Sequence, residues 1–167
     1  EITFTASTGA MATAVVTVSA VPPTITGPGT VCVSATITLS DATSGGTWSS
    51  SAASVATIDA GGVVTGVFNG TAIITYNVGG CVKLTVVTVN ASPNTISGVN
   101  PVCVGSSVAY TDATGGGTWS SADGSVATVG ATGIVTGASA GNTDISYTVT
   151  STGCFRTYPV TVNVMTA

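Results

Sequence analysis

The sequence predicts an all-β chain with two small sandwich domains in tandem. The first observation behind this prediction is an internal repeat, because Cys32 and Trp48 recur 71 residues later as Cys103 and Trp119. The second is a series of short alternating apolar runs rich in Thr and Val, which is typical of strands. The third is the set of glycine pairs and triplets that separate these runs, as an all-β sandwich requires.

The two repeats are expected to span residues 22–91 and 92–167. The offset of 71 residues becomes 73 where Cys81 matches Cys154, and an insertion of two residues near Ser151 accounts for the change. Each repeat is near the small end of the size range in which a domain folds alone. We expect about seven strands in each.

Residues 1–21 are a third, partial copy. The triplet Ile2-Thr3-Phe4 is similar to Ile74-Thr75-Tyr76, and residues 15–18 repeat the Val-Val-Thr-Val of residues 86–89. The segment therefore looks like the last two strands of a preceding domain, or a strand segment donated or added to a neighbour. Because two strands alone expose unpaired edges, we expect it to pair across a subunit boundary.

One residue bears on the order of the strands. Pro159 falls within the last strand of the second repeat, and a proline cannot donate a ladder hydrogen bond there. We therefore expect that strand to be an edge strand.

Composition excludes several classes of protein. Charged residues make up 5% of the chain, its only bases are Lys83 and Arg156, and the net charge is -4, so no nucleic-acid partner is expected. Ser, Thr and Gly interrupt each apolar run well before the length of a membrane-spanning helix, so no membrane insertion is expected.

The cysteines point to disulfides and an extracellular location. The chain has four cysteines, no histidine and no Cys-x-x-Cys pair, so a zinc site is not expected. Disulfides imply an oxidising compartment. A redox role would need neighbouring bases, which are absent, so we interpret the bridges as structural.

The cysteine and tryptophan spacing resembles that of immunoglobulin sandwiches, in which a bridge joins two sheets beside a buried Trp. The strings Gly-Gly-Thr-Trp-Ser-Ser and Ser-Val-Ala-Thr, present in both copies, resemble the bacterial immunoglobulin-like group 2 repeats. The cysteine-bearing variant is similar to tandem modules of very large surface proteins in Bacteroidetes-type bacteria. The resemblance covers the whole chain and implies an adhesin, a cell-surface stalk or an extracellular fibre.

Four cysteines permit three pairings. The repeat favours Cys32 with Cys81 and Cys103 with Cys154, so that each domain has one internal disulfide. In the chain-entropy model, a bridge that closes a loop of about fifty residues stabilises a domain by about 4 kcal/mol. This is comparable to the whole stability of a domain of this size.

Four aromatic residues are predicted to lie in the structural core, namely Trp48, Trp119, Tyr76 and Tyr147. The tyrosine hydroxyls are expected to close a turn, as in a tyrosine corner. The alternative for the two tryptophans is an exposed platform on which a sugar ring stacks.

No catalytic, cofactor-binding or metal-binding residue is predicted. Without histidine or a Ser/base pair, nucleophilic catalysis has no base to activate it, and we expect no enzyme activity. The aspartates do not form a calcium loop and are expected to form turns. They are Asp41, Asp59, Asp112, Asp123 and Asp144.

Two functions remain. The first is a structural repeat unit of an extracellular bacterial surface filament or stalk that assembles head to tail through β-strand pairing. The alternative is an adhesin module that binds carbohydrate or a host or cell-surface protein. The low charge favours the first, since it indicates that much of the surface is covered by other copies, in a homopolymer or as adjacent repeats of one long chain. Glycans on the many Ser and Thr hydroxyls would also keep such a surface soluble.

Overall fold

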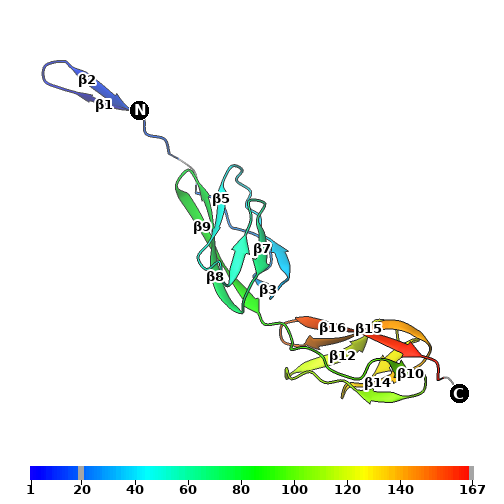
Figure 1. Cartoon of the computed structure of the whole chain (residues 1–167). Helices are drawn as coiled ribbons and strands as arrows, with labels where there is room; N and C mark the ends of the chain where they lie inside the picture. The colour runs from blue at the N-terminus through cyan, green and yellow to red at the C-terminus, as the bar shows by residue number, and fades with distance from the viewer. Residues whose placement is uncertain (19–20, 166–167) are drawn as a thin grey trace.

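The computed structural model describes residues 1–18 and 21–165, and every regular element within these ranges is a strand. Figure 1 shows a hairpin and then two sandwiches that lie end to end. The all-β prediction, with sandwich domains in tandem, is confirmed. Residues 19–20 of the expected partial copy and residues 166–167 of the second expected repeat lie outside the described residues.

The N-terminal segment contains a two-stranded hairpin. It consists of β1 (Ile2–Thr5) and β2 (Met11–Ala14), paired antiparallel, and every residue of both strands is exposed. Figure 1 draws the hairpin apart from both sandwiches. Residues 15–18, for which the sequence predicted the second strand, come after β2 and lie outside any strand.

The first sandwich, which we call domain 1, has seven strands in two sheets. One sheet has the order β3-β9-β8-β5, and the other has the order β4-β7-β6. The strands are β3 (Thr30–Cys32), β4 (Thr36–Thr38), β5 (Thr47–Ser50), β6 (Ala56–Ile58), β7 (Val63–Gly66), β8 (Gly70–Val78) and β9 (Cys81–Asn90).

The second sandwich, domain 2, repeats this topology. Its sheets have the orders β10-β16-β15-β12 and β11-β14-β13. The strands are β10 (Val102–Cys103), β11 (Ser107–Ala109), β12 (Gly117–Ser121), β13 (Ala127–Val129), β14 (Ile134–Gly137), β15 (Gly141–Val149) and β16 (Phe155–Asn163).

In both domains the first strand lies parallel to the last. The register of β3 and β9 places Cys32 opposite Asn90, and that of β10 and β16 places Cys103 opposite Asn163. Since Asn90 and Asn163 end their strands, the first cysteine of each domain lies at the end where the chain leaves that domain.

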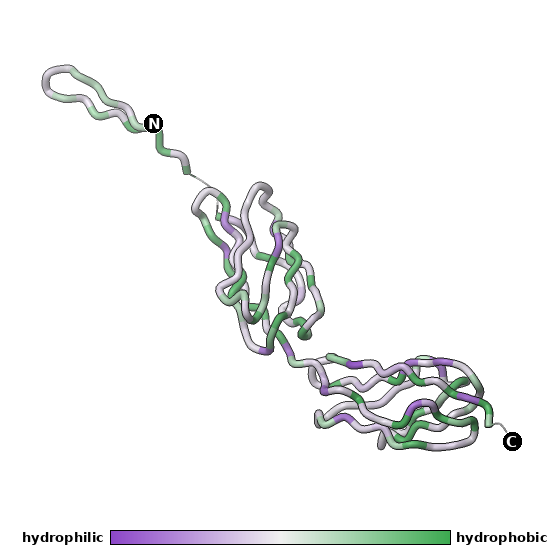
Figure 2. The backbone as a smooth tube through the Cα atoms, in the orientation of Figure 1, coloured by the Kyte–Doolittle hydropathy of each residue, from purple (hydrophilic) through white to green (hydrophobic). Residues whose placement is uncertain are grey.

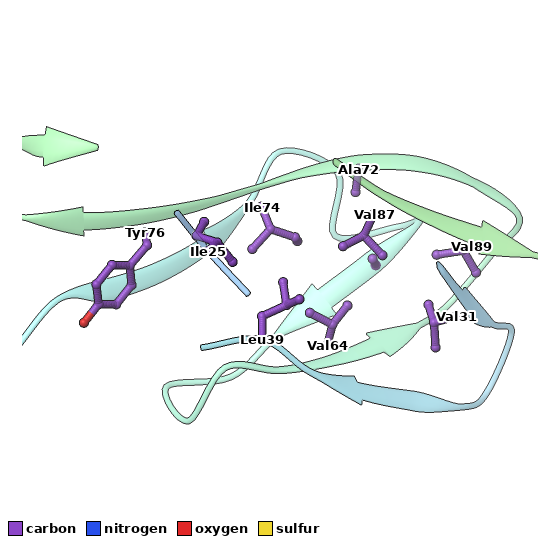
Figure 3. Close-up of a cluster of buried hydrophobic side chains, with 10 residues drawn as sticks. Ile25, Val31, Leu39, Val64, Ala72, Ile74, Tyr76, Val87 and Val89 are labelled. Carbon is purple, nitrogen blue, oxygen red and sulfur yellow. The ribbon is translucent and has the colours of Figure 1, made fainter. Parts of the chain in front are cut away.

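Alternation along the strands builds the core of each domain. In β8, Ala72, Ile74 and Tyr76 are buried, whereas Ile73 between them is exposed. Figure 3 shows these buried side chains packed against Leu39 and other residues of domain 1. Full burial of one such aliphatic or aromatic side chain stabilises the fold by about 1.5–3 kcal/mol.

Domain 2 has a larger aromatic group in its core. Tyr110 is 1% exposed, occupies the repeat position of Leu39, and lies edge-on to Tyr158 with the ring centroids 5.4 Å apart. Its hydroxyl donates a hydrogen bond of 3.0 Å to the carbonyl oxygen of Val99. Burial, and secondarily the charge that Tyr158 would carry when ionised, raise the pKa of Tyr110.

The prediction that the last strand of the second repeat is an edge strand is wrong. In the sheet order, β16 lies between β10 and β15. Because β10 pairs only with the last part of β16, at Val162 and Asn163, Pro159 is flanked by β15 alone. The missing N–H of Pro159 is therefore tolerated within a central strand.

Candidate functional site at the domain junction

Each domain has one cysteine at each end. In domain 1, β9 begins at Cys81 and ends at Asn90, opposite Cys32. In domain 2, Cys154 directly precedes β16, which ends at Asn163 opposite Cys103. The two cysteines of one domain therefore lie at opposite ends of its longest strand.

A disulfide joins the two domains at their junction. It links Cys32 to Cys154 across a sequence separation of 122, with the Cα atoms 5.7 Å apart. Cys154 is fully buried there. This bridge connects the end of domain 1 to the start of domain 2, as their end-to-end arrangement in Figure 1 allows.

The predicted bridges within each domain are therefore wrong. Cys81 is nine residues along β9 from the residue opposite Cys32, which corresponds to about 30 Å at 3.3 Å per residue. The same argument separates Cys103 from Cys154. A disulfide requires Cα atoms within about 7 Å of each other, so neither predicted pair can form in this fold. In the part of the chain that the structure describes, Cys103 is a half-buried thiol.

Hydrogen bonds hold the linker against both domains. The Ser92 hydroxyl donates to the carbonyl oxygen of Val33 in domain 1, at 3.1 Å. The next residue accepts from domain 2, because the Arg156 Nε–H donates to the carbonyl oxygen of Pro93, at 2.9 Å. An open hollow of about 350 Å³ lies between these contacts. Its lining comes from both domains and includes Ser34, Phe155 and Thr157.

This role of Arg156 was not predicted from the sequence. A signal was present, because Arg156 and Lys83 hold the same position two residues after the second cysteine of each repeat. Two bases in equivalent positions of so uncharged a chain indicate a shared structural requirement. Only the structure reveals the linker carbonyl that Arg156 contacts.

The predicted core aromatics form two equivalent pairs, one in each domain. The rings of Trp48 and Tyr76 lie 4.6 Å apart on adjacent strands β5 and β8, and those of Trp119 and Tyr147 lie 4.8 Å apart on β12 and β15. Both tyrosines are buried, whereas both tryptophans are half-buried and pack against the edge of the core.

Each tyrosine hydroxyl closes a turn, as the sequence predicted. The Tyr147 hydroxyl accepts a hydrogen bond of 3.0 Å from the Gly117 N–H and donates one of 2.6 Å to the Thr114 carbonyl oxygen. In domain 1, the Tyr76 hydroxyl bonds the Gly46 N–H and the Thr43 carbonyl oxygen in the same way. A side chain at this glycine would collide with the ring, since a Cβ on Gly46 would lie 2.3 Å from Tyr76 Cζ.

Four of the five aspartates cap turns. Asp41 and Asp112 accept from the backbone N–H two residues later, as Asp59 and Asp123 also do. The turn prediction is wrong for Asp144, which lies in β15 opposite Pro159.

The described residues contain no group of three or more His, Cys, Asp or Glu side chains able to hold a metal ion. They also include no helix with the length and apolarity that a membrane crossing requires.

The two-sheet topology and the tyrosine turn define the class of protein, an all-β chain of tandem immunoglobulin-like sandwiches. The family model of the bacterial Ig-like domain (group 2) matches residues 12–89 and 83–155, so the chain belongs to this family. The predicted resemblance is confirmed at the level of the family. Its Bacteroidetes-type origin stays a prediction.

The intimin fragment shares this fold, and the chain is also similar in sequence to a surface layer protein. The C-terminal fragment of intimin, in a complex with the intimin-binding domain of its translocated receptor, is 20% identical with a TM-score of 0.51, covering 87% of this chain and 66% of the fragment. Domains 1–6 of the surface layer protein SbsC are 25% identical with a TM-score of 0.32, covering 79% of this chain and 24% of that one. This chain thus spans about a quarter of that surface layer structure. No curated protein matches the chain.

Proposed function

We propose that this chain is a structural repeat unit of an extracellular bacterial surface filament or stalk, in which domains are joined head to tail. The observation that carries the proposal is the Cys32–Cys154 bridge. It fixes the end where the chain leaves domain 1 (the exit end) against the end where the chain enters domain 2 (the entry end). Domains joined by a linker alone move relative to one another by default. A bridge with hydrogen bonds on both sides of the linker opposes that motion, which is what a stiff spacer needs.

Chemistry supports an extracellular location. Structural disulfides persist in oxidising compartments and are rare in the cytosol. Figure 2 shows that strongly hydrophilic residues are sparse along both sandwiches, in keeping with a charged fraction of 5%. Such a surface is suited to packing beside other copies, since a free-standing domain usually has about 25% charged residues.

The exposed hairpin is the proposed non-covalent contact. Phe4 is 70% exposed and Met11 is 72% exposed, so the hairpin buries little of its own apolar surface. A two-stranded hairpin is marginal in water, and its unpaired edges accept a further strand. We propose that residues 1–21 pair with a sheet of a neighbouring copy. Contacts of this kind that do not close into a ring build fibres.

Deletion of residues 1–21 tests this assembly by electron microscopy. We expect long fibres from the full chain and monomers or short stubs from the truncated chain. The control is a full chain with Thr3 and Thr13, which face each other across the hairpin, both changed to Ser, because this preserves the strands and their hydroxyl groups. Fibres of normal length from the truncated chain would show that the hairpin is not the connector.

One observation favours the alternative adhesin function. The hollow at the junction is open to solvent and presents Phe155, which is 61% exposed, beside the Arg156 guanidinium. An aromatic face next to a fixed donor is a common arrangement for binding a sugar. Binding to a panel of oligosaccharides that is lost in Phe155→Ala would support this function over a purely structural one.

A further inference from the structure

The far end of domain 2 reproduces the surface that receives Cys154 on domain 1. Cys103 occupies the repeat position of Cys32, at the end of the first strand and opposite the last residue of the last strand. The next residues, Val33 and Val104, are both half-buried and donate their N–H groups to Asn90 and Asn163, each at 2.9 Å.

The match extends through the adjoining turn. Ser34 has a φ of 69° and Gly105 a φ of 78°, so both residues adopt the left-handed conformation. Their N–H groups donate to Gly66 and Gly137, each at 2.8 Å. The backbone that presents Cys32 to its partner therefore presents Cys103 in the same way.

The entry ends of the two domains also correspond. Cys81 in domain 1 holds the repeat position of Cys154, and Lys83 holds that of Arg156. Pro22, which corresponds to the Pro93 that Arg156 contacts, is fully buried, so the linker packs onto the entry end in both domains. Cys154, covered by the junction, is fully buried, whereas Cys81 is half-buried.

We propose that the Cys103 end of domain 2 binds the Cys81 end of domain 1 in a second copy of this chain, and that a Cys103–Cys81 disulfide joins the two copies. This inference rests on the proposed function and names a covalent contact within it. The partner at the Cys103 end is a second copy, because this contact would repeat the junction that domains 1 and 2 already form. Every junction along the filament would then have the same bridge.

The bond forms by thiol–disulfide exchange with a small-molecule disulfide such as oxidised glutathione. One protein thiolate attacks the oxidant and releases one glutathione thiol, and the second protein thiolate then displaces the other glutathione from the mixed disulfide. Two protein thiols are oxidised to one disulfide, and one oxidised glutathione is reduced to two thiols.

The test is oxidation of the purified chain with glutathione redox buffer, then a non-reducing gel and peptide mapping. We expect a ladder of linked dimers, trimers and longer species. Trypsin is unsuitable because its only sites, Lys83 and Arg156, leave Cys103 and Cys154 on one peptide. Cleavage after aromatic residues and leucine places the four cysteines on four different peptides. The expected inter-chain pair is Cys103–Cys81, beside an intact Cys32–Cys154 pair.

The variant Cys103→Ser should form no species longer than a dimer and should keep the Cys32–Cys154 peptide. The matched control is Ser106→Ala, which changes a side chain nearby and should leave the ladder unchanged. A ladder that persists in Cys103→Ser, a mapped Cys103–Cys103 pair, or no ladder from the unmodified chain would each overturn the proposal.

These results are separable from the test of the proposed function. Fibres of normal length without the Cys103–Cys81 peptide would refute the covalent contact and leave the filament in place. A disulfide ladder from a chain that never forms fibres would refute the filament and leave the contact in place.

Discussion

Domains 1 and 2 have the same topology, the same tyrosine turn and a first cysteine in the same place, yet the two cysteines differ in state. Cys32 is bridged to the neighbouring domain, whereas Cys103, at the end of domain 2, is a thiol among the described residues. The local backbone is alike, so the difference comes from the contact that domain 2 makes with the end of domain 1. The cysteine at this position is bridged where a neighbouring domain packs against it.

The hydrophobic cores of the two domains also differ. Leu39 in domain 1 and Tyr110 in domain 2 fill the same repeat position, and Tyr110 is accommodated beside Tyr158, where domain 1 has Thr85. The outer frame of the sandwich is thus kept while neighbouring core residues change together.

The largest expected effect is a difference in stability between variants of the two equivalent cysteines. Cys32→Ser removes a bridge that spans more than 100 residues, which the chain-entropy model values at about 5 kcal/mol, while Cys103→Ser in the monomer should cost little. Small-angle scattering should show a broader range of inter-domain angles for Cys32→Ser. Denaturant unfolding should show a lower midpoint for Cys32→Ser alone. Equal effects of both variants would mean that the bridge does not couple the domains.

The pairing of Cys32 with Cys154 could not be predicted from the sequence. Repeat, alternation and glycine spacing are local patterns, and they identified the strands and the family. Which strands pair is a long-range property, and here the decisive pairing is the parallel contact of β3 with β9, which moves Cys32 to the far end of the strand from Cys81. Pairing the two cysteines of each repeat assumed that they lie close together in the folded domain, and this register separates them.

The candidate site was predictable only in part. The aromatic pairs recur at the repeat offset, and their tyrosine hydroxyls close the predicted turns. The contact of Arg156 with Pro93 depends on how the linker bends between two domains, which no periodic pattern encodes. The same holds for Asp144, because its place in β15 results from strand pairing.

Exchanging the core residues that differ between the domains should destabilise both domains. Tyr110→Leu removes a buried ring and a hydrogen bond and should destabilise domain 2 by about 2–3 kcal/mol. Leu39→Tyr should destabilise domain 1 by about 1–3 kcal/mol through overpacking, because Gly27 already lies against Leu39.

Each domain has one tryptophan, so fluorescence in Trp48→Phe or Trp119→Phe backgrounds reports the unfolding of a single domain. The control Tyr110→Phe keeps the ring and should cost about 1 kcal/mol. If Leu39→Tyr stabilised domain 1, the two cores would be interchangeable and the difference between them would have no packing cause.

The third prediction concerns the feature that the domains share. Tyr76→Phe and Tyr147→Phe each remove a hydroxyl with two hydrogen bonds and leave a glycine N–H without its partner. We expect a loss of about 1–2 kcal/mol in each domain, measured by denaturant unfolding with the same single-tryptophan variants. A clearly unequal loss would show that the turn is not an equivalent element of the repeat.

The smallest expected effect concerns a surface loop. Asp123 in domain 2 bonds the Ser125 hydroxyl at 2.6 Å and its N–H at 2.9 Å, whereas domain 1 has Ala52 at this position. The hydrogen bond from the Ser125 hydroxyl, and after it that from the Ser125 backbone, lowers the pKa of Asp123 from its ordinary value of 3.8, although burial acts in the opposite direction.

A carboxyl whose pKa is lower in the folded state stabilises the fold above its unfolded pKa, and this contribution disappears as the pH falls through the folded pKa. The unfolding midpoint of domain 2 should therefore exceed that of Asp123→Ala by a small, constant amount above about pH 5, and the difference should shrink toward zero below the ordinary value of 3.8. The reciprocal variant Ala52→Asp should give domain 1 the same acid dependence, because Ser54 holds the repeat position of Ser125. A difference between domain 2 and Asp123→Ala that stays constant down to pH 2 would show that the loop is held by its backbone alone, as domain 1 already is through the N–H groups of Val55 and Ala56 on the Ala52 carbonyl.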